Sequence, residues 1–409
     1  MSVEKWQNFQ VDDVSEEFDS LQGQLSTLNL GPTHPATHGI FQNILKMDGE
    51  KVYAAEQTVG YIHRAFEKIA ERRPYGQITP LTDRLNYCSA PINNIGWIMA
   101  VEKLAGIKMS KRVDYMRVII MELARISDHV ICNTIIGNDT GALTGFTYFY
   151  QMRELIYEMY EQVCGGRLTT NICRIGGFER DFNSIFHERM KHFLDVFPKF
   201  FNEFRILLQR NRIFMDRTMN VGPISAERAL AYGLTGPNLR AAGVDYDVRV
   251  ANPYSSYEDF DFEIPVGDGG DTYARFMVRQ EEMLQSYSII KQAYENLPEG
   301  DFHVDAPNFY LPDKDEVYNT IEGLIYHFKV VMAETPMPKG ELYFPVEGGN
   351  GELGFYIVSD GGRTPYRLHF RRPCFIYYQA YPEMIHGQML SDAIVTLSSM
   401  NVIAGELDA

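Results

Sequence analysis

The chain has 409 residues, of which 45% are hydrophobic and 22% are charged, so it is a globular protein long enough for two or three domains or one large elaborated body. Its 38 basic and 54 acidic side chains give a net charge of −16, which excludes a general nucleic-acid-binding surface because neutralising phosphates requires clustered Lys and Arg. No apolar run is long enough to cross a bilayer, and the acidic N-terminus has no signal-peptide core. We therefore expect a cytoplasmic protein, or one on the cytoplasmic face of a membrane, without a transmembrane helix.

The elements predicted in chain order are an arm, a small segment rich in turns, a long helical region and a β-rich end. Residues 1–25 are polar and predict an N-terminal arm, whereas residues 26–60 mix extended patterns with Gly and Pro and predict a β-rich or α/β segment. Apolar residues then recur every three or four positions within 61–335, which predicts amphipathic helices, each with an apolar stripe, at about 91–105, 111–136, 150–163, 188–212 (with Pro198 as a kink or restart) and 270–296. Residues 336–409, with a strand pattern at 341–378, predict a β-rich segment and a tail that pack on the core. The predicted fold class is α+β, mainly α, with a central helical bundle.

Three motifs suggest binding sites that their surroundings disfavour. The glycines of GNGELG at 349–354 match a dinucleotide fingerprint, but a strand follows them instead of a helix, so a β-hairpin is the better interpretation. His34 and His38 have the i, i+4 spacing of zinc ligands, but prolines disrupt a regular helix there and no further Cys or His completes the set. The GDGGD at 267–271 lacks the spaced carboxylates of a calcium loop and predicts a turn.

The cysteines argue against two further classes of protein: those held by a disulfide framework and those with a metal site of several thiolates. Five scattered residues, an odd number, predict reduced thiols rather than a disulfide framework, and no two form a CxxC pair. They are Cys88, Cys132, Cys164, Cys173 and Cys374. A site that needs several thiolate ligands, as a nickel–iron centre does, is therefore disfavoured.

Three segments place polar residues in apolar or tightly turned surroundings: GPTHPATHG at 31–39, LTDRLNYCSAPINN at 81–94 and IIGNDTGALTGF at 135–146. Their His38, Tyr87 and Asp139 are the residue types that a proton-coupled redox site needs. Reduction of a quinone to a quinol takes two electrons and two protons, and a Tyr hydroxyl and an imidazolium can each supply a proton to a carbonyl oxygen. The alternative is structural: a turn histidine, a core tyrosine and a capping aspartate.

A resemblance to a known family rests on seven motifs in the same order: GPTHPATHG, GYIHRAFEK, LTDRLNY, VEKLAGI, YMRVIIMEL, TGPNLRAAGVDYDVR and IVSDGGRTPYR. They resemble the D subunit, or 49 kDa family, which carries the quinone site of respiratory complex I, NADH:quinone oxidoreductase. The match covers the chain from about Leu25 onward. Since that family is related to the large subunit of nickel–iron hydrogenases, the resemblance implies a bundle of that type. It also implies that the quinone head group occupies the place of the hydrogenase metal.

The resemblance implies a role for five residues. His38 and Tyr87 correspond to the two quinone head-group ligands, and Asp139 corresponds to the acid paired with that histidine. Arg84 corresponds to an arginine near the terminal tetranuclear iron–sulfur cluster, which the adjacent B subunit holds. Family members commonly carry a histidine in a G-A-R-M-H stretch near the same cluster, but this chain reads GGRLT and has Thr169 there. Without a histidine that takes up a proton, the cluster is expected to have a lower reduction potential, which favours menaquinone over ubiquinone as the substrate.

The function implied is that of one subunit of a proton-pumping NADH:quinone oxidoreductase, forming the quinone-reduction cavity together with the B subunit. The chain is expected to bind no metal or cofactor alone, to have no NADH site, and to contact the B and C subunits and the membrane-embedded H subunit. Its expected location is peripheral, on the cytoplasmic side of the bacterial inner membrane. Two alternatives are a true nickel–iron hydrogenase subunit, which the missing CxxC pairs disfavour, and a purely structural scaffold of a related complex.

Overall fold

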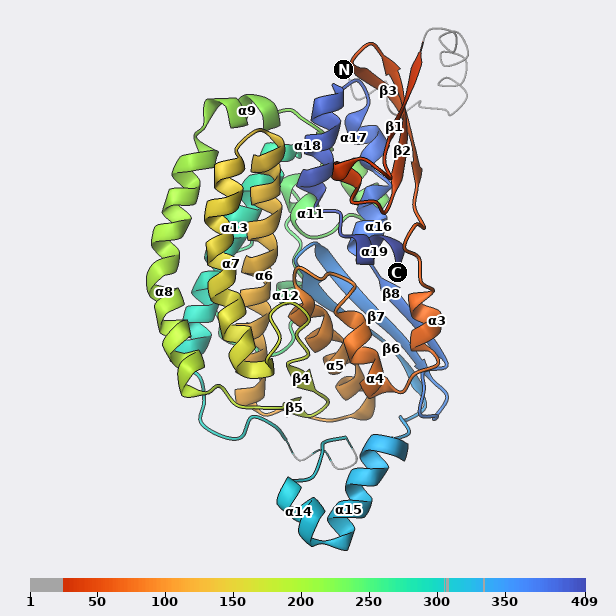
Figure 1. Ribbon diagram of the computed structural model, residues 1–409, viewed down its shortest axis with the longest axis vertical. Helices are drawn as coiled ribbons and strands as arrows, with labels where there is room; N and C mark the ends of the chain where they lie inside the picture. The colour runs from red at the N-terminus through yellow and green to blue at the C-terminus, as the bar shows by residue number, and fades with distance from the viewer. Residues whose placement is uncertain (1–24, 305, 307–308, 334) are drawn as a thin grey trace.

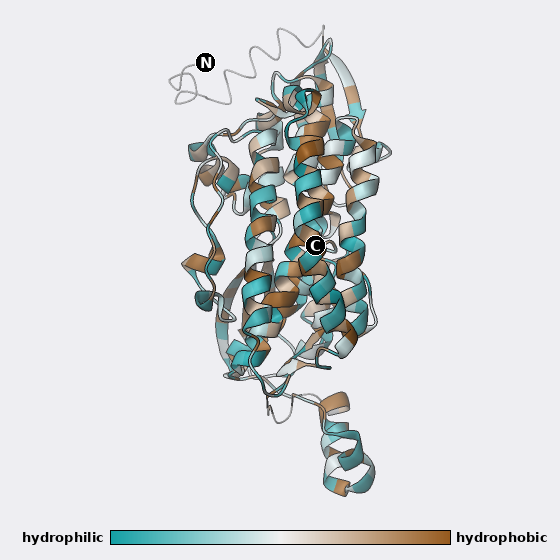
Figure 2. Ribbon diagram, turned by 90° about the vertical axis from the view of Figure 1, so that its left-hand side faces the viewer, coloured by the Kyte–Doolittle hydropathy of each residue, from teal (hydrophilic) through white to brown (hydrophobic). Residues whose placement is uncertain are grey.

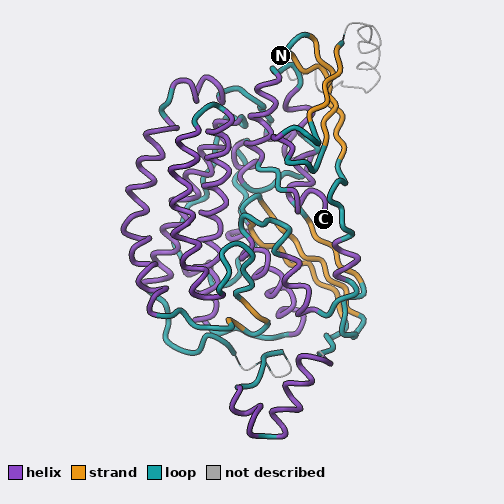
Figure 3. The backbone as a smooth tube through the Cα atoms, viewed as in Figure 1, coloured by secondary structure: helices purple, strands orange, loops and turns teal. Residues whose placement is uncertain are grey.

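Long helices stand side by side along most of the molecule, and small β-sheets flank them (Figures 1 and 3). The structure, a computed structural model, describes residues 25–409 except 305, 307–308 and 334, so the predicted arm lies outside it apart from Leu25. The first sheet of this described part joins strands β1, β2 and β3 in sequence order, all antiparallel: Ser26–Leu30, Gln42–Asp48 and Lys51–Thr58. A second sheet pairs β4 (Cys173–Arg174) with β5 (Gly177–Phe178).

The bundle is built around one helix, α6, which packs against four others. The structure confirms the four helices predicted at 91–105, 111–136, 150–163 and 270–296, although α7 begins at Leu143, seven positions before its predicted start. The five helices of this group are α5 (Ala90–Ala105), α6 (Lys111–Asp139), α7 (Leu143–Cys164), α13 (Thr272–Glu295) and α18 (Leu390–Met400). The GDGGD turn ends at Asp271, whose carboxylate caps α13 by accepting a hydrogen bond from the amide of Ala274 at 2.8 Å.

The predicted helix at 188–212 differs from the structure at both ends. Helix α8 (Ser184–Phe204) begins where Asn183 caps the amide of Phe186, and it runs through Pro198 without ending. The break comes later, at a single π-helical turn (Arg205–Gln209) before α9 (Arg212–Thr218). The prediction of a restart at Pro198 is therefore wrong. The apolar pattern continues across the π turn, so the pattern alone did not predict the turn.

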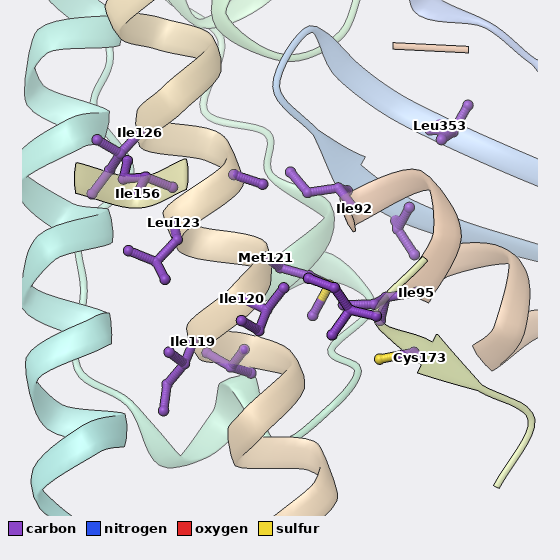
Figure 4. Packing of buried hydrophobic residues seen from close by; sticks show 14 of the residues in the cluster. Ile92, Ile95, Ile119, Ile120, Met121, Leu123, Ile126, Ile156, Cys173 and Leu353 are labelled. Carbon is purple, nitrogen blue, oxygen red and sulfur yellow. The ribbon is translucent and has the colours of Figure 1, made fainter. Parts of the chain in front are cut away.

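Helix α6 is buried on nearly all sides, whereas its apolar spacing predicted one buried stripe. Ile119, Leu123 and Ile126 pack toward neighbouring elements (Figure 4), as the stripe predicted. Several charged residues in the middle of the helix, among them Glu122 and Arg125, are fully buried as well. A buried charge is tolerated only when it is paired and hydrogen-bonded, so these residues require partners from other elements.

Glu122 is the centre of one buried ion cluster. Its carboxylate accepts from Arg125 at 3.2 Å and from Arg249 at 3.2 Å, and the hydroxyls of Tyr257 and Ser286 each donate to it at 2.6 Å. Burial alone would raise the pKa of Glu122, but the two guanidinium groups more than offset burial and hold the pKa below its ordinary value. The carboxylate is therefore ionised, and α6 is joined through it to α12 (Val248–Ala251) and α13.

Arg240 is the centre of a second cluster beside the first. It forms ion pairs with Glu282 at 2.7 Å and with Glu347 at 2.9 Å, and His129 bonds to Glu282 at 2.7 Å. Burial lowers the pKa of His129 despite this acidic neighbour, so the ring is neutral and donates its Nε2 hydrogen. This cluster joins α6, α11 (Pro237–Ala241), α13 and β6 (Gly340–Gly348).

The C-terminal part combines one three-stranded antiparallel sheet with short helices. Strand β6 pairs with β7 (Gly351–Ser359), which pairs with β8 (Arg367–Arg371). Residues 349–354 lie in the β6–β7 hairpin, as predicted, and a Cβ on Gly349 would come within 1.8 Å of Asp128 Oδ2. The strand pattern extrapolated to 378 is wrong, because 373–378 is helical and the tail is made of α16–α19.

The remaining elements of the described chain are short. They are η1 (Pro35–Thr37), α3 (Phe66–Ala70), α4 (Tyr75–Thr82), α10 (Ala226–Tyr232), η3 (Tyr257–Asp259), α14 (Lys314–Asn319), α15 (Ile321–Phe328), η4 (Lys329–Ala333), α16 (Pro373–Tyr378), α17 (Tyr381–Ile385) and α19 (Ala404–Asp408). The four predicted segment boundaries and the relation of the bundle to hydrogenases stay predictions.

Glu122→Gln should destabilise the fold severely, because it leaves Arg125 and Arg249 buried without their shared negative charge. We expect the free energy of unfolding in a urea titration to fall by about 3–5 kcal/mol. Asp216→Asn removes the partner of Arg212 in an exposed pair (3.6 Å) and should cost less than about 1 kcal/mol. Equal, small losses in both variants would show that the buried cluster does not hold the bundle together.

Candidate functional site

A cavity of about 280 Å³ opens where five segments of the chain meet. Its wall is formed by the loop around η1, the turn before α5, the C-terminal half of α6, the N-terminal half of α7, and the end of α18 with the residues that follow; Leu168, from the segment after α7, adds one further side chain. The wall is mostly apolar and includes a few polar side chains. The polar side chains are His38, Tyr87, Tyr150, Arg153, Ser398 and Asn401.

His38 reaches the cavity from a tightly held loop. Buried Thr37 fixes the loop by donating its hydroxyl hydrogen to the carbonyl of His34 at 2.8 Å. His38 itself takes a left-handed backbone conformation (φ 52°) at the end of η1, which is a short 3-10 turn and not the α-helix that an i, i+4 zinc pair needs. No described residue hydrogen-bonds to the His38 ring, so the ring is available to a ligand.

Tyr87 enters from the turn before α5. Residues 83–89, which carry Arg84 and Tyr87, form turns rather than a helix. Asn86 secures these turns: its side chain accepts from the amide of Cys88 at 3.0 Å, and its carbonyl accepts from Asn93 at 2.9 Å. Burial raises the pKa of Tyr87 to about 12, so its hydroxyl keeps its proton at neutral pH. Within the described residues this hydroxyl has no hydrogen-bond partner.

Sequence reasoning missed Asn401, which lines the cavity, and Asp128, which is hydrogen-bonded to it. Asn401 donates to Asp128 Oδ1 at 3.2 Å, and Asn86 donates to Asp128 Oδ2 at 3.2 Å. Asp128 is fully buried and is one of the charges that raise the pKa of Tyr87, after burial itself and two cysteines. The signal for Asp128 was its charge within the apolar pattern of α6, but spacing did not reveal its hydrogen bonds to Asn86 and Asn401.

Asp139 ends α6 and meets the cavity through Ser398. The Ser398 hydroxyl, which lines the cavity, donates to Asp139 Oδ2, and the Asn138 amide lies at 3.5 Å from Oδ1. Among the described residues no hydrogen bond joins Asp139 to His38, so the pairing of this acid with His38 stays a prediction. Ser398, 259 positions away in the sequence, gave no signal of its role.

Arg84 and Thr169 are brought to one side of the molecule by Asn94. The Asn94 amide donates to Asp83 Oδ1 and to the carbonyl of Thr170, both at 2.5 Å, which ties together the segments that carry Arg84 and Thr169. Both side chains are exposed, and Leu168, adjacent to Thr169, lines the cavity. The two residues that the family resemblance associates with a partner's cluster therefore lie on neighbouring exposed segments beside the cavity.

Neither a metal cluster nor a membrane span is found in the part of the chain that the structure describes. No group of three or more His, Cys, Asp or Glu side chains there could hold a metal ion, and the cysteines are free thiols. No described helix is both long and apolar enough to cross a bilayer. The polar side chains of the cavity can donate and accept hydrogen bonds.

Comparison with known proteins places the chain among subunits of one respiratory enzyme. The NADH-quinone oxidoreductase D 2 subunit of Cytophaga hutchinsonii is 69% identical over 388 residues, which are 94% of this chain and 99% of the relative. The D subunit of the same enzyme from Flavobacterium johnsoniae is 67% identical over 397 residues, 97% of this chain and 96% of the relative. The C/D subunit of Bdellovibrio bacteriovorus is 47% identical over 390 residues, 95% of this chain but 70% of the relative.

The family model described as "Respiratory-chain NADH dehydrogenase, 49 Kd subunit" matches residues 139–409, more than half of the chain. The chain therefore belongs to the family of the 49 kDa subunit of respiratory-chain NADH dehydrogenase, as the seven sequence motifs predicted.

Proposed function

We propose that this chain acts as the D subunit of an NADH-quinone oxidoreductase and forms, with the iron–sulfur B subunit, the cavity in which quinone is bound and reduced. The observation that carries the proposal is that His38 and Tyr87, from segments far apart in sequence, line one cavity with ring and hydroxyl groups free of protein partners among the described residues. The volume of about 280 Å³ is near the lower end of ligand pockets, roughly 300–1,000 Å³. It suits a quinone ring, with the isoprenoid tail extending outward.

In this proposal the side chains of the cavity supply protons to the quinone. The tetranuclear cluster of the B subunit would supply the electrons. Tyr87 and His38 hydrogen-bond to the two quinone oxygens and deliver the two protons. Because its raised pKa keeps Tyr87 protonated, the hydroxyl holds its proton until the quinone oxygen becomes negatively charged. Asp139, through Ser398, places a carboxylate at the same wall and can favour protonation at the site.

The partners follow from the family and from the placement of the exposed residues. The B subunit covers the side that carries Arg84 and Thr169. The Bdellovibrio relative is named C/D and is longer than this chain, which supports a position for the C subunit next to this one. The membrane-embedded H subunit lies where the quinone tail leaves, and the assembly is peripheral on the cytoplasmic side of the inner membrane. The chain holds no cofactor of its own.

Tyr87→Phe keeps the ring but removes the proton donor, so NADH:quinone reduction by the purified complex should fall by about 10²–10⁴-fold, the usual contribution of a positioned general acid. NADH oxidation by ferricyanide, which accepts electrons upstream of the cavity, should persist. Tyr366→Phe removes an exposed hydroxyl and serves as the matched control. Normal quinone reduction in the Tyr87→Phe complex would favour a scaffold role for this chain.

Thr169 predicts a cluster of low, nearly pH-independent potential, because a threonine hydroxyl cannot take up the proton that would stabilise an added electron. A low-potential cluster suits menaquinone. We expect Thr169→His to raise the potential and make it pH-dependent in redox titrations of the cluster's EPR signal at several pH values. Thr147→His, which also adds an exposed histidine, should change neither property. A steep pH dependence in the unmodified complex would remove the support for menaquinone.

A further inference from the structure

The cavity wall contains a buried positive charge whose role the proposed function leaves unassigned. Arg153 on α7 lines the cavity and is only 4% exposed. Its Nε donates to the hydroxyl of Ser127 at 3.1 Å, and its Nη1 donates to the hydroxyl of Tyr150. The guanidinium also lies over two rings, 5.2 Å from the centroid of Tyr150 and 4.6 Å from that of Tyr157.

All of these contacts are neutral, and no described carboxylate forms an ion pair with Arg153. Other buried arginines of the described chain differ. One group is paired with acids: Arg117, Arg125, Arg240 and Arg249. Arg275 and Arg279 donate to backbone carbonyl oxygens and do not line the cavity. A buried cation without an anion is costly, so a site that retains one beside a cavity is suited to a negatively charged occupant.

We propose that Arg153 stabilises the negatively charged, reduced form of the quinone in the cavity. This inference rests on the proposed function. When the neutral quinone accepts one electron from the iron–sulfur cluster of the B subunit, one negative charge appears on its oxygens, facing the guanidinium. The second electron and two protons, from the Tyr87 hydroxyl and the His38 imidazolium, complete the quinol, and both groups regain their protons from water.

Arg153 gives up no proton in this sequence, because a guanidinium stays charged throughout the physiological range. Its contribution is a fixed positive charge, oriented beforehand by Ser127 and Tyr150, at the place where negative charge develops. Such a charge interacts weakly with a neutral quinone and strongly with the reduced anion. It therefore acts on the rate of reduction more than on the binding of the substrate.

A pair of inhibitors tests this charge preference in the intact complex. 2-Hydroxy-1,4-naphthoquinone is an anion at neutral pH, whereas 2-methoxy-1,4-naphthoquinone is neutral and nearly the same size. We expect the unmodified complex to bind the anion more tightly, and Arg153→Gln to lower the anion-to-neutral affinity ratio at least tenfold. Arg153→Lys, which keeps the charge, should retain most of the ratio. Arg189→Gln, which removes an exposed arginine paired with Glu158 at 2.9 Å, should leave it unchanged.

Kinetics separate this role from a structural one. In Arg153→Gln the kcat for quinone reduction should fall roughly 10- to 100-fold with little change in KM, as when one stabilising donor is removed. Ferricyanide reduction checks assembly. If Tyr87→Phe impairs reduction but Arg153→Gln changes neither kcat nor the inhibitor ratio, the role of Arg153 is refuted and the cavity assignment stands. If neither variant affects quinone reduction, the proposed function itself fails. If Arg153→Lys restores assembly of the complex but does not restore the anion-to-neutral affinity ratio, the charge role is also refuted.

A different observation carries a second inference. Helices α14 and α15 with η4 project from the body at the end opposite to the β1–β3 sheet (Figures 1 and 2). No residue of α14 and only Gly323 of α15 is buried. Large apolar side chains at helical spacing remain exposed, namely Ile321 (68%), Leu324 (53%), Ile325, Phe328 (60%), Val331 and Met332. Short helices without apolar burial are not stable alone, so another surface must cover the apolar face of this hairpin.

We infer that this surface belongs to another protein of the complex that presents an apolar groove with a basic rim. The hairpin carries four acidic residues, Asp313, Asp315, Glu316 and Glu322, against Lys314 and Lys329. This charge disfavours an anionic lipid surface and also disfavours a second copy of the same acidic hairpin. An apolar groove with a basic rim would cover the apolar face of α15 and also pair with the acidic residues of the hairpin.

Photo-crosslinking from Leu324→p-benzoylphenylalanine in the intact, purified complex tests the second inference. We expect one major crosslink, to a groove of another subunit that carries at least two Lys or Arg residues, and none from the same substitution at Leu230, which is similarly exposed (56%). Leu324→Glu should weaken retention of that subunit. Crosslinks to lipid, to a second copy of this chain or to nothing would each overturn the assignment.

Discussion

The charges inside α6 impose the constraint on which the rest of the structure depends. Arg117, Glu122, Arg125, Asp128 and His129 are buried on one helix, and none can remain there without a partner. Their partners come from α5, α12, α13, the β6 strand and the residues after α18. Apolar packing would tolerate several arrangements of these elements, whereas each ion pair accepts one. The ion pairs therefore fix which surfaces of the bundle face α6.

The cavity benefits from this fixed arrangement because its wall continues along the same helix. Asp128 belongs to the buried polar interior and also holds Asn86 and Asn401, which position the turn of Tyr87 and the end of α18. Gly349 belongs to the same junction, since any side chain there would collide with Asp128. The turn that carries Tyr87 is thus held by Asp128 and Asn86, which do not line the cavity themselves.

Sequence patterns predicted the long helices well because their apolar residues recur with helical period, and turn chemistry correctly rejected a dinucleotide loop at Gly349. They failed where tertiary contacts override local pattern, at the π turn after Phe204 and at the helices after Arg371. The resemblance named His38 and Tyr87, which the structure brings to one cavity. It did not name Arg153, because a single arginine on an amphipathic helix looks solvent-exposed until its burial is known.

The cavity has a kinetic consequence for how the protein must be made. Its wall joins residues 36–41 with residues 397–403, and the segments between them contribute the rest. Forming contacts of such long sequence separation costs loop-closure entropy, so these contacts slow folding. During synthesis the loop of His38 emerges long before α18 can cover it. The nascent chain must therefore keep several apolar and charged core helices soluble while the site is incomplete, which makes chaperone assistance most valuable at this stage.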